Sequence, residues 1–167
     1  MFNIGDKVIY GGEGVCRVDR IEDKIIGGKK VSYYVLNRLD GVNSVFFVPV
    51  DSRAADEKMR SIISASEIKK IIEDSKPAAW IAADRERKDA YRAAVTTVDR
   101  QSIASHVKTV YAVKEELEKV GKKLHKTDEY FLEDVKKLMF GELSAVFNIE
   151  KNQIIPFIVG EFQPTEK

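Results

Sequence analysis

Residues that build disulfides and metal sites are scarce in this chain of 167 residues. It contains one cysteine, Cys16, and two histidines, His106 and His125. A single cysteine cannot form a disulfide within the chain, and two scattered histidines with one cysteine do not make a zinc ligand set. We therefore expect no structural metal and no cofactor.

Long apolar runs are also missing, although 44% of the residues are hydrophobic. No stretch approaches the roughly 18 consecutive apolar residues that a membrane-spanning helix needs. The N-terminus lacks the charged start, apolar middle and small-residue cleavage site of a secretory signal. These absences predict a globular, cytoplasmic protein with no membrane partner, large enough for one modest core or two small ones.

Recognisable catalytic motifs are absent as well. His106 and His125 are remote from any serine or cysteine motif, and a lone histidine on or between helices is more typical of a surface or capping position than of a catalytic base. The run 11–14 is rich in glycine but lacks the lysine and the serine or threonine of a phosphate-binding loop, and no GxGxxG opens a helix. We expect a protein that is not an enzyme and has no small-molecule substrate.

The net charge is only +1, but the charge is unevenly distributed along the chain. Residues 1–75 are balanced, with twelve Lys/Arg and twelve Asp/Glu, whereas residues 76–126 carry twelve Lys/Arg against seven Asp/Glu. Residues 127–167 are acidic, with four against eight. The basic middle third fits either a solvated helix surface or a limited phosphate contact, and it does not fit an extended nucleic-acid footprint.

Short runs of β-branched and aromatic residues, bounded by glycine or aspartate, make up the first fifty residues. Their spacing of roughly 8 to 12 residues is typical of a small all-β unit. Four or five antiparallel strands of this length predict an SH3-like or Tudor-like β-barrel. Pro49 cannot donate a ladder hydrogen bond, so it should end the last strand or lie at an edge, with a possible docking edge nearby. The predicted strands are residues 7–10, 15–21, 31–36 and 44–50.

After residue 50 the apolar residues follow a helical period. Ser64 and Glu67 fit a capping box, in which each side chain satisfies the other's free backbone N–H, and three isoleucines then share one helical face. Pro77 should end this helix, because proline has no backbone N–H and restrains the residue before it. We predict that the helix closes the barrel domain, which gives a first domain of residues 1–75 and a second of residues 76–167.

Three longer helices are predicted in the second domain, over about residues 79–97, 99–119 and 127–147. Each has one apolar stripe, so the stripes should pack together in an all-α helical bundle. The tail, residues 154–159, is apolar without helical spacing. It should fold back onto the bundle, or alternatively contact a partner.

An ordered series of short segments distinguishes the first half of the chain. The segments are Phe2–Tyr10, Gly14–Val15, Ile25–Gly27, Tyr33–Leu36, Val48–Val50 and Met59–Ser64. In this order, over about residues 2–72, they resemble the CarD/CdnL/TRCF family of bacterial proteins that bind RNA polymerase. The helical half, with Trp80 after the boundary and Glu142-Leu143 near the end of its last helix, resembles the C-terminal domain of the CarD branch.

The resemblance implies two interfaces and a function. The Tudor-like barrel would pair through a strand edge with the β subunit of RNA polymerase, and the helical domain would contact promoter DNA at the upstream edge of the melted region. Trp80 would enter the minor groove there, flanked by phosphate contacts from Arg85, Arg87 and Lys88. The positions that correspond to the polymerase contact are Lys24, Phe46, Phe47, Val48 and Pro49, although Phe47 stands where the family can have arginine. Such a protein would change the stability of the open promoter complex, in a direction that the sequence does not specify.

Two alternatives remain open at this stage. Without the resemblance, a core position in the bundle would be the favoured interpretation of Trp80. A Tudor-like barrel could also read a peptide or a modified residue without contacting a promoter, with an aromatic cage of Tyr10, Tyr33 and Tyr34. Adjacent tyrosines in one strand face opposite sides of a sheet, which makes this cage less favoured. For the same reason, one of Phe46 and Phe47 should enter the core and the other should face outward.

Overall fold

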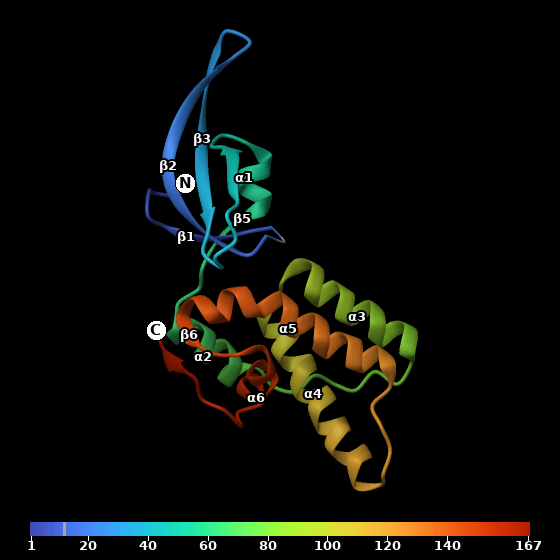
Figure 1. Cartoon of the computed structure of the whole chain (residues 1–167). Coiled ribbons are helices and arrows are strands. Elements are labelled where there is room, and N and C mark those ends of the chain that lie inside the picture. The colour runs from blue at the N-terminus through green and yellow to red at the C-terminus, as the bar shows by residue number, and fades with distance from the viewer. Residues whose placement is uncertain (12) are drawn as a thin grey trace. The chain divides into compact units, whose positions relative to one another are not determined.

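The computed structural model describes residues 1–11 and 13–167. Gly12, part of the glycine-rich run 11–14, lies outside the described residues. The chain divides into two compact units, Met1–Ile63 and Ser64–Lys167. Figure 1 shows that the first unit is dominated by strands and the second by helices.

The first unit is built on a five-stranded antiparallel sheet in the order β4-β3-β2-β1-β5. Its elements are β1 (Lys7–Tyr10), β2 (Val15–Ile26), β3 (Lys29–Arg38), β4 (Val45–Pro49), α1 (Arg53–Lys58) and β5 (Met59–Ser61). The longest feature is the β2–β3 hairpin (Figure 1). Its turn is formed by Gly27 and Gly28, which both have positive φ, at 57° and 76°. A two-residue turn that joins strands in this way needs positive φ at both positions, which glycine adopts without strain.

The predicted antiparallel sheet is confirmed, but a closed barrel is not seen. Among the described residues β4 and β5 are the two edges of the sheet, and they do not pair with each other. The chain between them forms helix α1, which starts where the Ser52 hydroxyl accepts a hydrogen bond from the Ala55 N–H at 3.1 Å. Since β5 has only three residues and pairs with β1, the sheet ends before it can close on itself.

The core of the first unit lies on one face of the sheet, beneath α1. Tyr34 is its largest fully buried side chain, and its hydroxyl accepts a hydrogen bond from the Phe2 N–H at 3.1 Å. Alternation along β3 and β4 places every second side chain on this face, as a half-buried strand requires. The core comprises Val8, Cys16, Val18, Tyr34, Leu36, Val48, Ala55 and Met59.

The second unit contains the predicted helices and several elements that were not predicted. Its elements are α2 (Ala65–Asp74), α3 (Asp84–Thr97), α4 (Arg100–Lys119), α5 (Lys126–Val146), β6 (Phe147–Asn148), a 3-10 turn (Lys151–Gln153), α6 (Ile154–Ile158) and β7 (Thr165–Glu166). Asp99 caps α4, the helix predicted over about residues 99–119, by accepting a hydrogen bond from the Ser102 N–H at 3.1 Å. His125 caps α5 through Nδ1, which accepts from the Thr127 N–H at 3.2 Å. Helix α3 begins five residues after the predicted start at 79.

Helix α2 belongs to the second unit, so the boundary predicted after Ser75 differs from the observed division by one helix. The capping box is present, since the Ser64 N–H donates to Glu67 Oε2 and the Glu67 N–H donates to Ser64 Oγ. At the other end of α2, Lys108 of α4 donates to the carbonyl oxygens of Ile72 and Ser75. These bonds to α4, together with burial of the isoleucine face, fix α2 within the helical unit.

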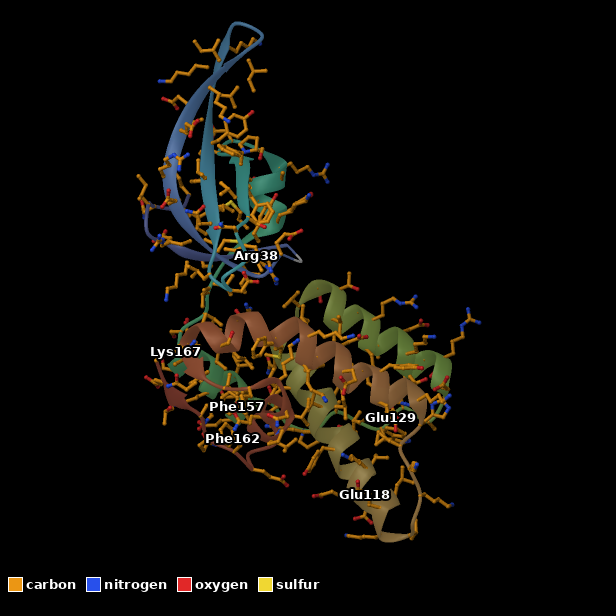
Figure 2. The ribbon with its side chains drawn as sticks, in the orientation of Figure 1. Arg38, Glu118, Glu129, Phe157, Phe162 and Lys167 are labelled. Atoms are coloured by element: carbon orange, nitrogen blue, oxygen red, sulfur yellow. The ribbon has the colours of Figure 1, made fainter. Side chains whose placement is uncertain are left out.

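The C-terminal segment is part of the helical unit, and it makes the prediction of an all-α domain wrong. Strand β6 pairs with β7, with Phe147 opposite Glu166, so the unit includes a two-stranded sheet. The predicted apolar tail forms the short helix α6, which carries Phe157 (Figure 2). Phe157 is 2% exposed and packs edge-on against Phe147, with ring centroids 5.2 Å apart. Helix α6 contacts α4 and α5, so the tail does fold back.

Candidate functional site

Trp80 lies in the segment between α2 and α3, and 43% of its surface is exposed. Arg87, near the start of α3, places its guanidinium carbon 4.5 Å from the centroid of an indole ring of Trp80. This is a cation–π distance. The indole is supported by Arg87 and keeps a large open surface, so the alternative of a core position is not supported.

Arg87 is a buried cation, only 5% exposed, and all its described hydrogen bonds are within the helical unit. Its Nε donates to Asp128 Oδ1 at 2.7 Å and its Nη2 donates to Asp128 Oδ2 at 3.2 Å, which makes a bidentate ion pair. Its Nη1 donates to the carbonyl oxygens of Ile81 at 3.0 Å and Ala82 at 3.4 Å. Arg87 therefore ties the segment that carries Trp80 to the first turn of α5.

The three cations predicted to contact phosphate differ in their environment. Arg85 and Lys88 are exposed on α3 and are available to an anion. Arg87 is not available, because its guanidinium is buried and its donors are already used. We correct its predicted role from phosphate contact to support for Trp80.

Asp128 completes this support from α5 and is 1% exposed. Besides the Arg87 pair, it accepts a hydrogen bond at 2.6 Å from the hydroxyl of Tyr91, whose ring stacks on Phe131 with centroids 4.0 Å apart. Burial raises the pKa of the Tyr91 phenol, and the bond to Asp128 raises it further. The sequence analysis missed both residues. One available signal was the spacing of Arg87 and Tyr91, four apart on one face of α3.

His106 of α4 lies against the same cluster, with its ring edge-on to Tyr91 at 5.4 Å and to Phe131 at 6.2 Å. It is partly buried, in contrast to the surface or capping position predicted for it, whereas His125 does cap a helix. Burial lowers the pKa of His106, because desolvation penalises the charged imidazolium. His106 is therefore neutral near pH 7.

This shift predicts a loss of stability in mild acid. Because the folded-state pKa of His106 lies below that of the unfolded chain, about 6.5, the unfolded chain binds the proton first as the pH falls. The contribution of neutral, buried His106 to the free energy of unfolding is full above about pH 6.5. Below that pH it decreases, with a slope of at most about 1.4 kcal/mol per pH unit. Urea denaturation between pH 5 and 8 should show a shallower slope for His106→Gln than for the wild type. Equal slopes would contradict the prediction.

The N-terminal sheet carries a mixed cationic and aromatic patch on the face opposite its core. Lys24 of β2 places Nζ 3.7 Å from the centroid of the Phe47 ring on β4 and 5.8 Å from that of Tyr33 on β3. Phe47 is 43% exposed. Because Lys24 holds one part of the ring by a cation–π contact, Phe47 presents a fixed apolar surface to a partner.

The expectation that Phe46 and Phe47 face opposite sides of the sheet is confirmed. Phe46 packs on the core and lies 5.2 Å from the Tyr10 ring, whereas Phe47 faces outward. Val48 is buried in the core, so its side chain is not available to a partner. Pro49 pairs with Tyr33 at the end of β4.

The outer edge of β4 exposes backbone groups. The Val50 N–H donates to the Ser32 carbonyl and the Arg38 N–H donates to the Ser44 carbonyl, so the even-numbered residues of this strand bond to β3. Alternation of an antiparallel ladder then directs the backbone groups of Val45 and Phe47 to the outer edge. Within the described part of the chain no strand covers that edge. It can accept an added strand.

Comparison with known protein families finds a match to this unit. Residues 2–63 match the CarD-like/TRCF RID domain, and the match ends where the first compact unit ends. The first unit of the chain is similar to the CarD-like/TRCF RID domain. A search of curated proteins finds no match to the chain.

The RID domain contains all five residues predicted to contact polymerase, and the structure brings two of their side chains together. Lys24 and Phe47 form one outward contact, while Phe46 and Val48 serve the core. The family match does not extend to the helical unit, where Trp80, Arg85 and Lys88 lie.

Two kinds of feature are absent from residues 1–11 and 13–167. In that part of the chain no helix is long and apolar enough to cross a membrane. It also holds no group of three or more His, Cys, Asp or Glu side chains arranged to bind a metal ion.

Proposed function

We propose that this protein is a transcription regulator that acts by binding and not by catalysis. Its RID domain holds the β subunit of RNA polymerase, and its helical unit contacts promoter DNA at the upstream edge of the melted region. By binding the melted promoter and the closed promoter with different affinity, it changes the stability of the open complex. The match of residues 2–63 to the RID domain carries this proposal.

The β4 edge and the Phe47 surface support the polymerase contact. Backbone groups of Val45 and Phe47 at an uncovered edge provide the hydrogen bonds of an added strand, and the ring of Phe47 provides an anchor beside them. Aromatic anchors of this kind contribute much of the binding energy in protein interfaces. Lys24 keeps the ring in place and adds a positive charge.

The environment of Trp80 supports the DNA contact. An apolar plate can lodge at a base step that is already partly unstacked, and melting DNA offers such steps at a lower energetic cost. The indole is open to solvent and held from behind by Arg87, so little mobility is lost on binding. Arg85 and Lys88, exposed on the adjoining helix, can hold the phosphate backbone.

The two interfaces predict separable defects. We expect Phe47→Ala in the full chain to weaken capture of isolated polymerase β subunit by about tenfold or more, through loss of the aromatic anchor.

Trp80→Ala should retain that capture and lose the effect on promoter opening, measured with a base-unstacking fluorophore in the melted region. Both side chains are substantially exposed, so both variants should fold like the wild type in circular dichroism.

Each outcome bears on one part of the proposal. Wild-type protein that fails to capture the β subunit would contradict the polymerase contact. If Trp80→Ala opens promoters like the wild type, the DNA contact is not made by the indole. Loss of β capture by Trp80→Ala would contradict the assignment of polymerase binding to the RID domain.

The alternative of a modified-residue reader gains no support from the tyrosines. Tyr34 is buried in the core, Tyr10 packs against Phe46, and Tyr33 lies on the opposite face near Lys24. An aromatic cage requires its rings to surround one cation. These three rings do not form one.

A further inference from the structure

A groove of about 290 Å³ lies between α3 and α5, and Trp80 is not among its lining residues, although Lys88 is. The two helices pack directly against each other (Figure 1). Helix α3 contributes Lys88 and Arg92 to the lining, and the start of α5 contributes Lys126 and Tyr130. The groove is close in volume to the smallest pockets that hold a ligand.

The charged side chains that line this groove are mostly cationic. Lys88, Arg92 and Lys126 contribute three positive charges, against one carboxylate from Asp134. All three cations are exposed, and none forms a salt bridge with any residue in 1–11 or 13–167. Their charge is therefore available to an anion that enters the groove, and two helices present it from two sides.

Three aromatic side chains also line the groove. Tyr130 is 65% exposed, which is unusual for a side chain of its size, and it borders the groove. Phe131 and Tyr91, stacked on each other, also line it. An exposed ring beside clustered cations is the combination with which proteins bind single-stranded nucleic acid, because bases stack on the ring and phosphates contact the cations.

We propose that this groove binds an unstacked nucleotide of a DNA single strand. The base stacks on Tyr130, and the flanking phosphates contact Lys88, Arg92 and Lys126. A base pair within a duplex cannot present one base face to Tyr130, because both of its faces are covered by neighbouring pairs. The assignment rests on the proposed function in one respect, since promoter melting supplies the single strand.

The test measures anisotropy of a fluorescein-labelled oligothymidylate with the full-length protein over a range of salt concentrations. We expect tighter binding of the single strand than of a duplex of equal length. Tyr130→Ala should weaken single-strand binding about 5- to 100-fold, the usual effect of removing a base-stacking aromatic. Arg92→Ala should reduce the slope of log K against log salt by about 0.7, the value for one phosphate contact on a single strand.

Lys137→Ala is the matched control, since Lys137 is exposed on α5 and is not part of the groove lining. It should bind oligothymidylate like the wild type. Wild-type binding that is absent, that favours duplex, or that is unchanged in Tyr130→Ala and Arg92→Ala would overturn the proposal. Complete competition by thymidine monophosphate at equal nucleotide concentration would also overturn it, because the groove would then recognise a free nucleotide.

The same variants separate this proposal from the proposed function. Trp80→Ala leaves the groove intact and should bind oligothymidylate like the wild type. If Trp80→Ala loses the effect on promoter opening while Tyr130→Ala leaves oligonucleotide binding unchanged, only the proposed nucleotide site in the groove is contradicted. If Trp80→Ala leaves the effect on promoter opening unchanged while Tyr130→Ala loses oligonucleotide binding, only the indole contact is contradicted.

Discussion

We expect Asp128→Asn to lower the free energy of unfolding of the helical unit by about 3 to 5 kcal/mol, the usual effect of breaking a buried ion pair. Arg87 would remain buried without its carboxylate, and the Tyr91 hydroxyl would lose its acceptor or have to rebond to a neutral amide. An uncompensated buried charge costs more than the lost attraction, because the low-dielectric interior solvates it poorly. The exposed Asp134→Asn on the same helix should change stability by under about 0.5 kcal/mol.

Urea denaturation followed by tryptophan fluorescence measures this effect directly. Trp80 is the only tryptophan in the chain, and its ring makes a cation–π contact with Arg87. Its fluorescence emission therefore reports on the unit that Asp128 stabilises. A loss below about 1 kcal/mol, or one equal to that of Asp134→Asn, would show that the ion pair does not anchor the unit.

Asp128→Asn should also affect promoter opening under conditions in which the protein stays folded. The carboxylate holds Arg87, and Arg87 both underlies the indole and bonds to the carbonyls of Ile81 and Ala82. Loss of the carboxylate should therefore allow the segment to move and make Trp80 less well positioned. Comparison with Trp80→Ala, which should retain the folded unit, separates positioning of the indole from its presence.

Phe157→Ala should lower the stability of the same unit by about 3 to 5 kcal/mol, as is typical when a large aromatic side chain is removed from a core. Phe157 is fully enclosed and packs edge-on against Phe147, so truncation leaves a cavity and removes an aromatic contact. The neighbouring Ile154 and Ile158 are also buried, which limits collapse of the cavity. The prediction assigns the apolar tail a structural role.

Phe162→Ala is the matched control, because Phe162 has the same side chain but is only partly buried (Figure 2). Its truncation should cost distinctly less than that of Phe157. Chemical denaturation of both variants under identical conditions makes the comparison. Equal losses of stability in the two variants would indicate that α6 is not a core element. They would then favour the alternative in which the tail contacts a partner.

Local features of the fold could be predicted well from the sequence. The capping box at Ser64 and the cap at Asp99 depend on hydrogen bonds between residues three apart, so the local sequence contains both partners. The hairpin turn at Gly27-Gly28 and the opposite orientation of Phe46 and Phe47 follow from backbone geometry in the same way.

Features that depend on long-range packing were predicted less well. An apolar helix face indicates that α2 is buried, but it does not indicate which domain buries it; Lys108, more than thirty residues away, ties it to α4. A series of strands predicts a sheet, but closure of the sheet depends on pairing between its two edge strands. Here the edges are β4 and β5, and helix α1 occupies the chain between them. Short strands such as β6 and β7 carry too few residues to show a period.

The sequence by itself determined the order of the longer strands and helices, the segment that resembles the RID domain and the cluster of cations that follows Trp80. Propensity, periodicity and motif order are properties of neighbouring residues. Only the tertiary structure decided that Arg85 and Lys88 face solvent while Arg87 is buried. Asp128, the partner of Arg87, is 41 residues away in the chain. Three cations within four residues are chemically alike until the fold supplies a buried carboxylate to one of them, and that pairing converts a cation able to bind phosphate into the support of an exposed indole.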